Sequence, residues 1–183
     1  MPRRLAARRL WCVAPLLLLS ACGSAEPPAL EPMPQTVPAD LCATVPKALR
    51  TGLVSDTTTD EAGNPTAACS LRSPVGAAQP VRAVITWLQL DDEYSADDVL
   101  ASQCRSFDLA TLRNESGFRA RGADKACAAS GRSDRGGSAT MAAVAGQQVV
   151  TVRYDAEATD AAAALSRGRS MLEGVLAALT TGS

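Results

Sequence analysis

The stretch VRAVITWLQLD, residues 81–91, decides the fold. It is rich in β-branched and aromatic residues, the types that are enriched in strands. Its apolar residues fall on both of the faces that alternate along a strand, which is typical of a central strand covered on both sides. The sequence therefore predicts a sheet built around residues 81–91, with helices packed against it.

The segments before this strand predict one more strand and a short helical region. AACSLR, residues 67–72, has the composition of a short strand, whereas residues 55–66 are polar and rich in turn-forming residues, which predicts a loop. Upstream, apolar residues recur every four positions, as on one face of a helix. This helix is predicted to begin at Asp40, to kink or restart at Pro46, and to end near Gly52.

A longer helix is predicted after the central strand. Ser95 with Asp98 three residues later resembles a capping box, and the helix should run to about Leu112. Its inward face is expected to consist of Leu100, Cys104, Phe107 and Thr111. Residues 113–136 are polar, with a short strand predicted near 118–121.

The end of the chain predicts a hairpin and a final helix. SATMAAV (138–144) and QVVTVRY (148–154) flank a glycine-containing turn, as the two strands of a hairpin do. The final helix should begin at Thr159 or Asp160 and end near Leu179, with two internal glycines, Gly168 and Gly174, that allow close packing. The element order α-β-β-α-(β)-β-β-α predicts an α+β fold with an antiparallel sheet and helices packed on it.

The N-terminus has the pattern of a secretory signal. Four arginines in the first ten residues precede the apolar stretch from Trp11 to Ala21, which is shorter than the roughly 20 residues of a membrane-spanning helix. Leu19-Ser20-Ala21-Cys22 resembles the lipobox of bacterial lipoproteins, which implies cleavage before Cys22 and acyl chains such as palmitate on it. Two or more acyl chains anchor a protein durably. A plain secretory signal with an incidental cysteine is the alternative.

These features divide the chain into three parts. Residues 1–21 are the predicted signal peptide, residues 22–39 carry the lipidated cysteine and a tether with five prolines, and residues 40–183 form one domain. The expected location is the extracytoplasmic face of the cell membrane. Without the signal, 14 basic and 19 acidic residues remain, an acidic balance that argues against nucleic-acid binding.

Cysteine usage fits an exported domain. Setting aside Cys12 in the signal and Cys22, four cysteines remain: Cys42, Cys69, Cys104 and Cys127. Four cysteines allow three connectivities, and disulfides are favoured outside the cytosol. We favour the sequence-local pairs Cys42–Cys69 and Cys104–Cys127 over crossed pairs or four free buried thiols.

The chain also resembles a family of actinobacterial lipoproteins that share a domain of unknown function. The resemblance rests on Asp40-Leu41-Cys42 before a short helix, Cys69 at the start of a strand, and Gly122-Ala123-Asp124-Lys125-Ala126 before two strands. Leu41, Ala123 and Lys125 replace the proline, glycine and glutamate of the family pattern. Such domains look distantly like the extracellular sensor domains of mycobacterial Ser/Thr kinases. The resemblance implies an envelope location and binding of a ligand or partner, and it supplies no catalytic residues.

Two charged clusters have both a functional and a structural interpretation. Five carboxylates lie within eight residues and could offer oxygen ligands to Ca²⁺, namely Asp91, Asp92, Glu93, Asp97 and Asp98. We favour a solvated acidic turn that leads into a helix N-terminus, where acidic residues are stabilised. Six basic residues could meet anionic headgroups or wall polymers, but a solvated face is the simpler explanation: Arg113, Arg119, Arg121, Lys125, Arg132 and Arg135.

Three single residues also have both a functional and a structural interpretation. Asp124 could contact a ligand, although anchoring a turn through its own backbone is the favoured role. Trp87 and Tyr154 could line a pocket, although core packing is favoured. The chain has no histidine, so Ser-His-Asp and Cys-His arrangements are excluded, and we expect neither a metal nor a cofactor.

The sequence thus predicts a lipid-anchored extracytoplasmic protein that is not an enzyme. Its domain is expected to bind a small ligand or an envelope component. The alternative is a protein-interaction module that docks on a membrane-protein partner. An envelope hydrolase with paired carboxylates is the remote alternative.

Overall fold

The computed structural model describes residues 36–61, 64–107, 112–133 and 136–181. Within these residues, the helices are α1 (Leu41–Thr44), α2 (Lys47–Arg50), α3 (Ala96–Phe107) and α4 (Ala161–Thr181). The strands are β1 (Val54–Asp60), β2 (Thr66–Arg72), β3 (Val81–Gln89), β4 (Arg113–Asn114), β5 (Lys125–Ser133), β6 (Gly136–Ala145) and β7 (Gln148–Ala156).

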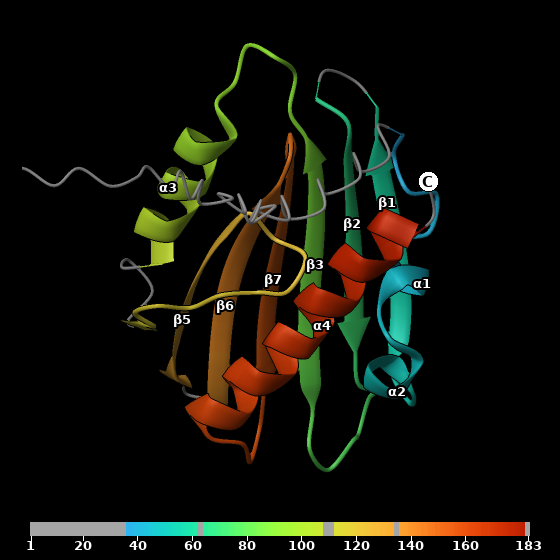
Figure 1. Ribbon diagram of the computed structural model, residues 1–183. Helices are drawn as coiled ribbons and strands as arrows, with labels where there is room; N and C mark the ends of the chain where they lie inside the picture. Colours follow the sequence, from blue (N-terminus) through green and yellow to red (C-terminus); the bar gives the residue numbers. More distant parts are fainter. Residues whose placement is uncertain (1–35, 62–63, 108–111, 134–135, 182–183) are drawn as a thin grey trace, which may run out of the picture.

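All seven strands join one antiparallel sheet with the order β1-β2-β3-β7-β6-β5-β4 (Figure 1). β3 lies between β2 and β7, which confirms the prediction of a central strand over residues 81–91. β6 and β7 form the predicted hairpin, and Gly146 occupies its turn with φ 58°. The predicted α+β fold, with an antiparallel sheet and packed helices, is confirmed.

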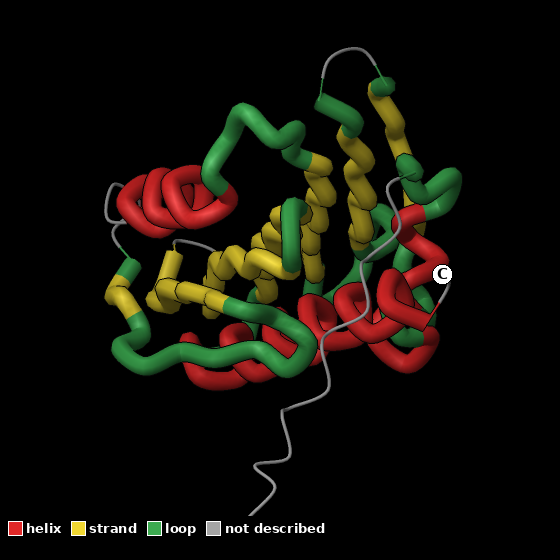
Figure 2. The backbone as a smooth tube through the Cα atoms, turned by 45° about the horizontal axis from the view of Figure 1, so that its top comes forward, coloured by secondary structure: helices red, strands yellow, loops and turns green. Residues whose placement is uncertain are grey.

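Helices lie on both faces of the sheet, but they cover the two faces unequally. α4 crosses one face, with α1 beside it, and we call this the α4 face (Figure 1). α3 lies on the opposite face, the α3 face, where it packs on β5, β6 and β7 (Figure 2). Ile85, Trp87 and Val152 are fully buried on the α4 face, together with Leu172 and Leu176 of α4. The main core therefore lies between the sheet and α4.

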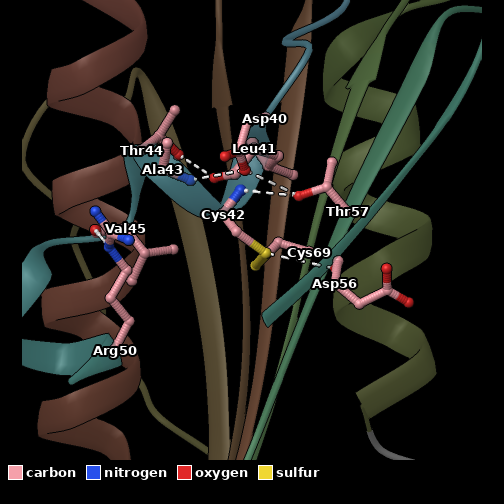
Figure 3. Close-up of a disulfide and its surroundings, with 10 residues drawn as sticks. All are labelled: Asp40, Leu41, Cys42, Ala43, Thr44, Val45, Arg50, Asp56, Thr57 and Cys69. Carbon is pink, nitrogen blue, oxygen red and sulfur yellow. Dashed lines mark hydrogen bonds between the residues drawn. A yellow bond between two sulfur atoms is a disulfide. The ribbon is translucent and has the colours of Figure 1, made fainter. Parts of the chain in front are cut away.

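Each disulfide fixes one helix to the sheet, and the two disulfides lie on opposite faces. Cys42 of α1 is bonded to Cys69 of β2 (Figure 3), and Cys104 of α3 is bonded to Cys127 of β5. Both predicted pairs are therefore confirmed, and crossed pairing or four free thiols is wrong. In the chain-entropy model, a disulfide closing a loop of this size stabilises the fold by about 3 kcal/mol.

Polar caps and small residues explain where the helices begin and how closely they pack. The Asp40 Oδ1 atom accepts a hydrogen bond from Ala43 N at 3.0 Å, as predicted for the first helix, and Pro46 separates α1 from α2. Ser95 Oγ accepts from Asp98 N at 3.3 Å at the start of α3. Asp160 Oδ1 accepts from Ala163 N at 2.7 Å, so Asp160 rather than Thr159 caps α4.

Residues 55–66 were predicted to be a loop, and this prediction is wrong for most of them. Residues 54–60 form the edge strand β1, which pairs with β2 along its whole length. Its side chains are exposed except at Thr57, so no apolar alternation marks it in the sequence. Thr57 Oγ1 donates to Asp40 Oδ1 and accepts from Cys42 N, which ties the strand to α1 (Figure 3).

The strand prediction within residues 113–136 is also wrong. Residues 118–121 lie in a loop, where Phe118 and Ala120 are buried against the main core. The strands of this region are the two-residue β4 and the nine-residue β5. β5 has the sequence KACAASGRS, whose small residues carry little strand propensity, so its pairing with β6 decides its structure.

Candidate functional site

The α3 face of the sheet has an uncovered part, which we call the open face. In the described chain, α3 lies over β5, β6 and β7, and Leu88 at the end of β3 packs against its cluster, while no helix lies over β1, β2 and the rest of β3 on this side (Figure 2). The side chains of the open face come from alternate positions of four strands: Asp56, Thr58, Ala68, Ser70, Arg72, Arg82, Val84, Thr86, Thr151, Arg153 and Asp155. They form a continuous surface of guanidinium, carboxylate, hydroxyl and small apolar groups.

Strand β3 shows the difference between the two faces most clearly. Ala83, Ile85 and Trp87, on the α4 face, are fully buried. Val84 and Thr86 are only half-buried on the other face. The prediction that this strand is covered on both sides is therefore wrong. Half-buried side chains on an uncovered sheet are available to a ligand that supplies the missing contacts.

Three arginines and an aspartate occupy the end of the open face near the β2–β3 loop. Arg72 and Arg82 are directly opposite each other, and Arg82 is also directly opposite Asp155. However, Arg153 Nε pairs with Asp155 Oδ2 at 3.1 Å, and Ser138 Oγ donates to Asp155 Oδ1. Asp155 is thus already held by two partners. Neither Arg72 nor Arg82 forms an ion pair with any described residue.

Hydroxyl groups occupy the middle of the open face. Thr86 of β3 and Thr151 of β7 are directly opposite each other, and their Oγ1 atoms are hydrogen-bonded. Ser70 and Thr58 lie on the neighbouring strands β2 and β1, and Ser70 is half-buried. Each hydroxyl group has one donor and two acceptor positions, so the Thr86–Thr151 pair keeps capacity for further hydrogen bonds.

The two aromatic residues considered as pocket walls belong to the core. Trp87 is fully buried, and its Nε1 donates to Gln148 Oε1 at 3.1 Å, while Gln148 Nε2 donates to Gln89 Oε1 at 2.9 Å. Tyr154 is buried among the residues under α4, and this burial raises the pKa of its hydroxyl, an effect that the Arg167 charge partly opposes. The favoured interpretation, core packing, is therefore confirmed for both.

The five carboxylates from Asp91 to Asp98 are all exposed. Asp97 pairs with Lys125, and Asp98 N is bonded to the Ser95 cap at the start of α3. Among the described residues, no group of three or more His, Cys, Asp or Glu side chains is arranged to hold a metal ion. The geometry of this cluster is that of an acidic turn and helix N-terminus, as favoured from the sequence.

The basic residues between positions 113 and 135 do not come from one element. Arg113 is in β4, Arg119 and Arg121 are in the following loop, and Lys125 and Arg132 lie near opposite ends of β5. Arg135 lies outside the described residues. All five described side chains are exposed, which fits a set of solvated surface charges.

Asp124 fixes a turn, although not the turn of its own backbone. Its Oδ2 atom accepts from Gly146 N at 2.8 Å, and its N–H donates to Val144 O at 2.8 Å. The residue thus connects the start of β5 to the β6–β7 turn. Its carboxylate has a structural partner 22 residues along the chain.

The residues of the open face were not singled out from the sequence. Arg82 and Arg153 are charged positions in largely apolar strands, and such positions indicate the solvent-facing side of a strand. That signal was available in the sequence. The pairing of Arg72 with Arg82, and of Thr86 with Thr151, depends on strand register and order, which one sequence does not specify.

Cys22, the predicted lipidation site, lies outside the described residues. None of the described helices is long and apolar enough to cross a membrane. We compared the chain with protein-family models, curated proteins and solved structures, and none of them matches it.

Proposed function

We propose that this protein is an exported lipoprotein, anchored through Cys22, whose domain binds a small ligand or an envelope component on the open face without catalysing a reaction. The observation that carries the proposal is the unequal covering of the sheet. One face is covered by α4 and α1, and on the other face Val84, Thr86 and Ser70 are half-buried with none of the described helices over them.

The proposed location agrees with the chemistry of the domain. Two disulfides hold α1 and α3 to the sheet, and such bonds persist in oxidising compartments. The lipobox-like Leu19-Ser20-Ala21-Cys22 and the proline-rich tether that follows it supply the means of export and anchoring. The resemblance to actinobacterial lipoproteins of unknown function points the same way.

The chemistry of the open face favours binding over catalysis. Guanidinium and hydroxyl groups hold ligands by hydrogen bonds, and the chain has no histidine to act as a general base. Asp155, the carboxylate next to the arginines, is held by Arg153 and Ser138. This arrangement suits recognition of polar groups rather than proton transfer.

A second candidate function is docking on a membrane-protein partner, favoured by apolar side chains exposed near the same end of the sheet. The Val75 side chain in the β2–β3 loop is 107% exposed and Val54 in β1 is 45% exposed. Under this alternative, Val75→Asp should release the partner, whereas it should leave ligand binding on the open face unchanged.

Anchoring is tested by replacing Cys22 with serine. The variant cannot accept the lipid, so we expect the protein to move from the membrane fraction to the soluble extracytoplasmic fraction. Mass spectrometry of the wild-type N-terminus should find Cys22 as the first residue, carrying acyl chains. Membrane retention of the Cys22→Ser variant would contradict the lipoprotein proposal.

Binding is tested by blocking the open face. Ser70→Trp places a large side chain in the middle of this face, and Ser166→Trp places the same side chain on the exposed side of α4 as the matched control. Native mass spectrometry of protein extracted gently from membranes should find a bound molecule on the wild type and on Ser166→Trp, and not on Ser70→Trp. Equal occupancy of both variants, or no bound molecule on the wild type, would contradict the proposal.

A further inference from the structure

Arg72 and Arg82 form a like-charge pair in a position where like charges repel. They are directly opposite each other on the antiparallel strands β2 and β3. Side chains in this arrangement have Cβ atoms only about 4.5–5.5 Å apart, and two equal charges there destabilise the sheet. Both side chains are exposed and point to the open face.

The acidic residues nearby do not neutralise this pair. Asp155 is directly opposite Arg82, but its two oxygens are bonded to Arg153 and Ser138. Asp56 lies on β1 diagonal to Arg72, two residues from Val54, which is directly opposite Arg72, and Asp56 forms no ion pair with Arg72. The overall charge of the chain is −1, so a local excess of positive charge here is a specific feature.

We propose that Arg72 and Arg82 together bind a phosphate group of a hydroxyl-rich ligand, such as a phosphorylated sugar or polyol of the envelope. This inference rests on the proposed function, because it names the ligand class for the open face. A bound anion between the two guanidinium groups replaces repulsion by two charge-assisted contacts. Arginine is suited to such contacts because its planar fork matches the oxygens of phosphate and carboxylate.

The charge of the pair favours phosphate over carboxylate. A carboxylate carries one negative charge and leaves a net positive charge on two arginines, whereas a phosphate monoester carries about −1.5 to −2 at pH 7. A phosphate monoester has three terminal oxygens and therefore has acceptors for both forks. Two adjacent arginines that share no protein carboxylate thus match a phosphate group better.

The rest of the open face matches the hydroxyl groups of such a ligand. Residues two positions apart on a strand are separated by about 7 Å, so Ser70 lies one such step from Arg72. Thr86 and Thr151 lie one step further along the sheet, at the same level as Ala68. A ligand held by its phosphate at the arginines would thus place its sugar over Ser70, and a longer ligand would extend to the hydroxyl groups of Thr86 and Thr151.

The test uses glucose-1-phosphate and inorganic phosphate as probes, with sodium chloride at equal ionic strength as the reference. Binding is measured by calorimetry and by the change in melting temperature for the wild type, the Arg72→Gln/Arg82→Gln variant and Arg119→Gln. Arg119 is an exposed arginine in the loop before β5, so its variant is the matched control for the loss of positive charge.

We expect saturable binding of both probes by the wild type and Arg119→Gln, with glucose-1-phosphate bound more tightly than phosphate. The double variant should lose at least tenfold in affinity for both probes. In phosphate-free buffer of low ionic strength, the double variant should melt at a higher temperature than the wild type, because the repulsion is removed. Acetate, as the carboxylate probe, should bind at least tenfold more weakly than phosphate.

Two outcomes would overturn the inference: unchanged phosphate affinity in the double variant, or an equal loss in Arg119→Gln. Failure here is distinguishable from failure of the proposed function. If Ser70→Trp removes the native ligand while phosphate binding does not depend on Arg72 and Arg82, the open face is the binding surface and the assigned ligand class is wrong. If Ser70→Trp retains the native ligand, the proposed function fails.

Discussion

Two glycines of α4 lie where a methyl group would meet a neighbour, and the two neighbours differ in stiffness. A Cβ atom on Gly168 would overlap the terminal methyl of Met141, which ends a flexible side chain. A Cβ atom on Gly174 would overlap the ring of Pro46, at 2.5 Å from its Cδ atom. The proline ring cannot turn aside, and it separates α1 from α2.

We therefore expect Gly168→Ala to change the free energy of unfolding little and Gly174→Ala to lower it. In a helix interior, alanine is favoured over glycine by about 1 kcal/mol. At Gly168 this gain should roughly offset the cost of moving Met141. At Gly174 the overlap with Pro46 should dominate and lower the free energy of unfolding by about 1–3 kcal/mol. Urea unfolding of both variants checks this, and equal destabilisation would contradict it.

Tyr154 is expected to lower the free energy of unfolding at high pH. Burial raises the pKa of its hydroxyl above the usual value of 10.0, so the folded state disfavours the phenolate. Below pH 10 the hydroxyl is protonated in both the folded and the unfolded state, and the free energy of unfolding has its full value. It falls as the pH rises through the folded pKa.

The expected result is a steeper loss of stability above pH 10 in the wild type than in Tyr154→Phe. Tyr94→Phe is the matched control, because the Tyr94 side chain is 51% exposed. Urea unfolding at several pH values between 9 and about 11 measures the difference. Parallel curves for the wild type and Tyr154→Phe would contradict the assignment.

At the scale of the elements, the two disulfides hold helices that join hydrophobic clusters of different size. α3 contributes Leu100 and Phe107 to a small cluster with Val144 and Val149, whereas α1 joins the main core. We therefore expect α3 to depend more on the Cys104–Cys127 bond than α1 depends on the Cys42–Cys69 bond.

Removal of this bond by Cys104→Ser/Cys127→Ser should lower the free energy of unfolding by about 3 kcal/mol. Hydrogen exchange should increase first in α3, because few apolar contacts remain there. Cys42→Ser/Cys69→Ser is the matched control, in which faster exchange should affect α1 and β1 and leave α3 protected. Faster exchange in α3 in both variants would contradict this assignment.

The elements also differ in how far the sequence predicts them. β3, β6 and β7 were predictable because their β-branched and apolar residues are buried, and α4 because its apolar stripe recurs at helical spacing. β1 was missed because an exposed edge strand has no apolar face, and β5 because alanine and serine carry a weak signal. The open face was missed because it depends on register between strands distant in sequence.

At the scale of the whole molecule, the arrangement of carboxylates gives a prediction about metal ions. The acidic residues from Asp91 to Asp98 are exposed, and one of them is paired with Lys125. We expect a chelator to leave the melting temperature unchanged and added Ca²⁺ to raise it by no more than added NaCl of equal ionic strength. A clear drop with the chelator, or a specific rise with Ca²⁺, would contradict this expectation.

The order β1-β2-β3-β7-β6-β5-β4 consists of two antiparallel meanders that meet at one seam, between β3 and β7. Each disulfide lies within one half: Cys42–Cys69 with β1–β3, and Cys104–Cys127 with β4–β7. No disulfide crosses the seam within the described residues. Under the proposed export, we expect the first pair to be oxidised before the second emerges, so that folding ends with the docking of two disulfide-bonded halves. Closure of the seam, which joins distant parts of the chain, is then the slow step of assembly.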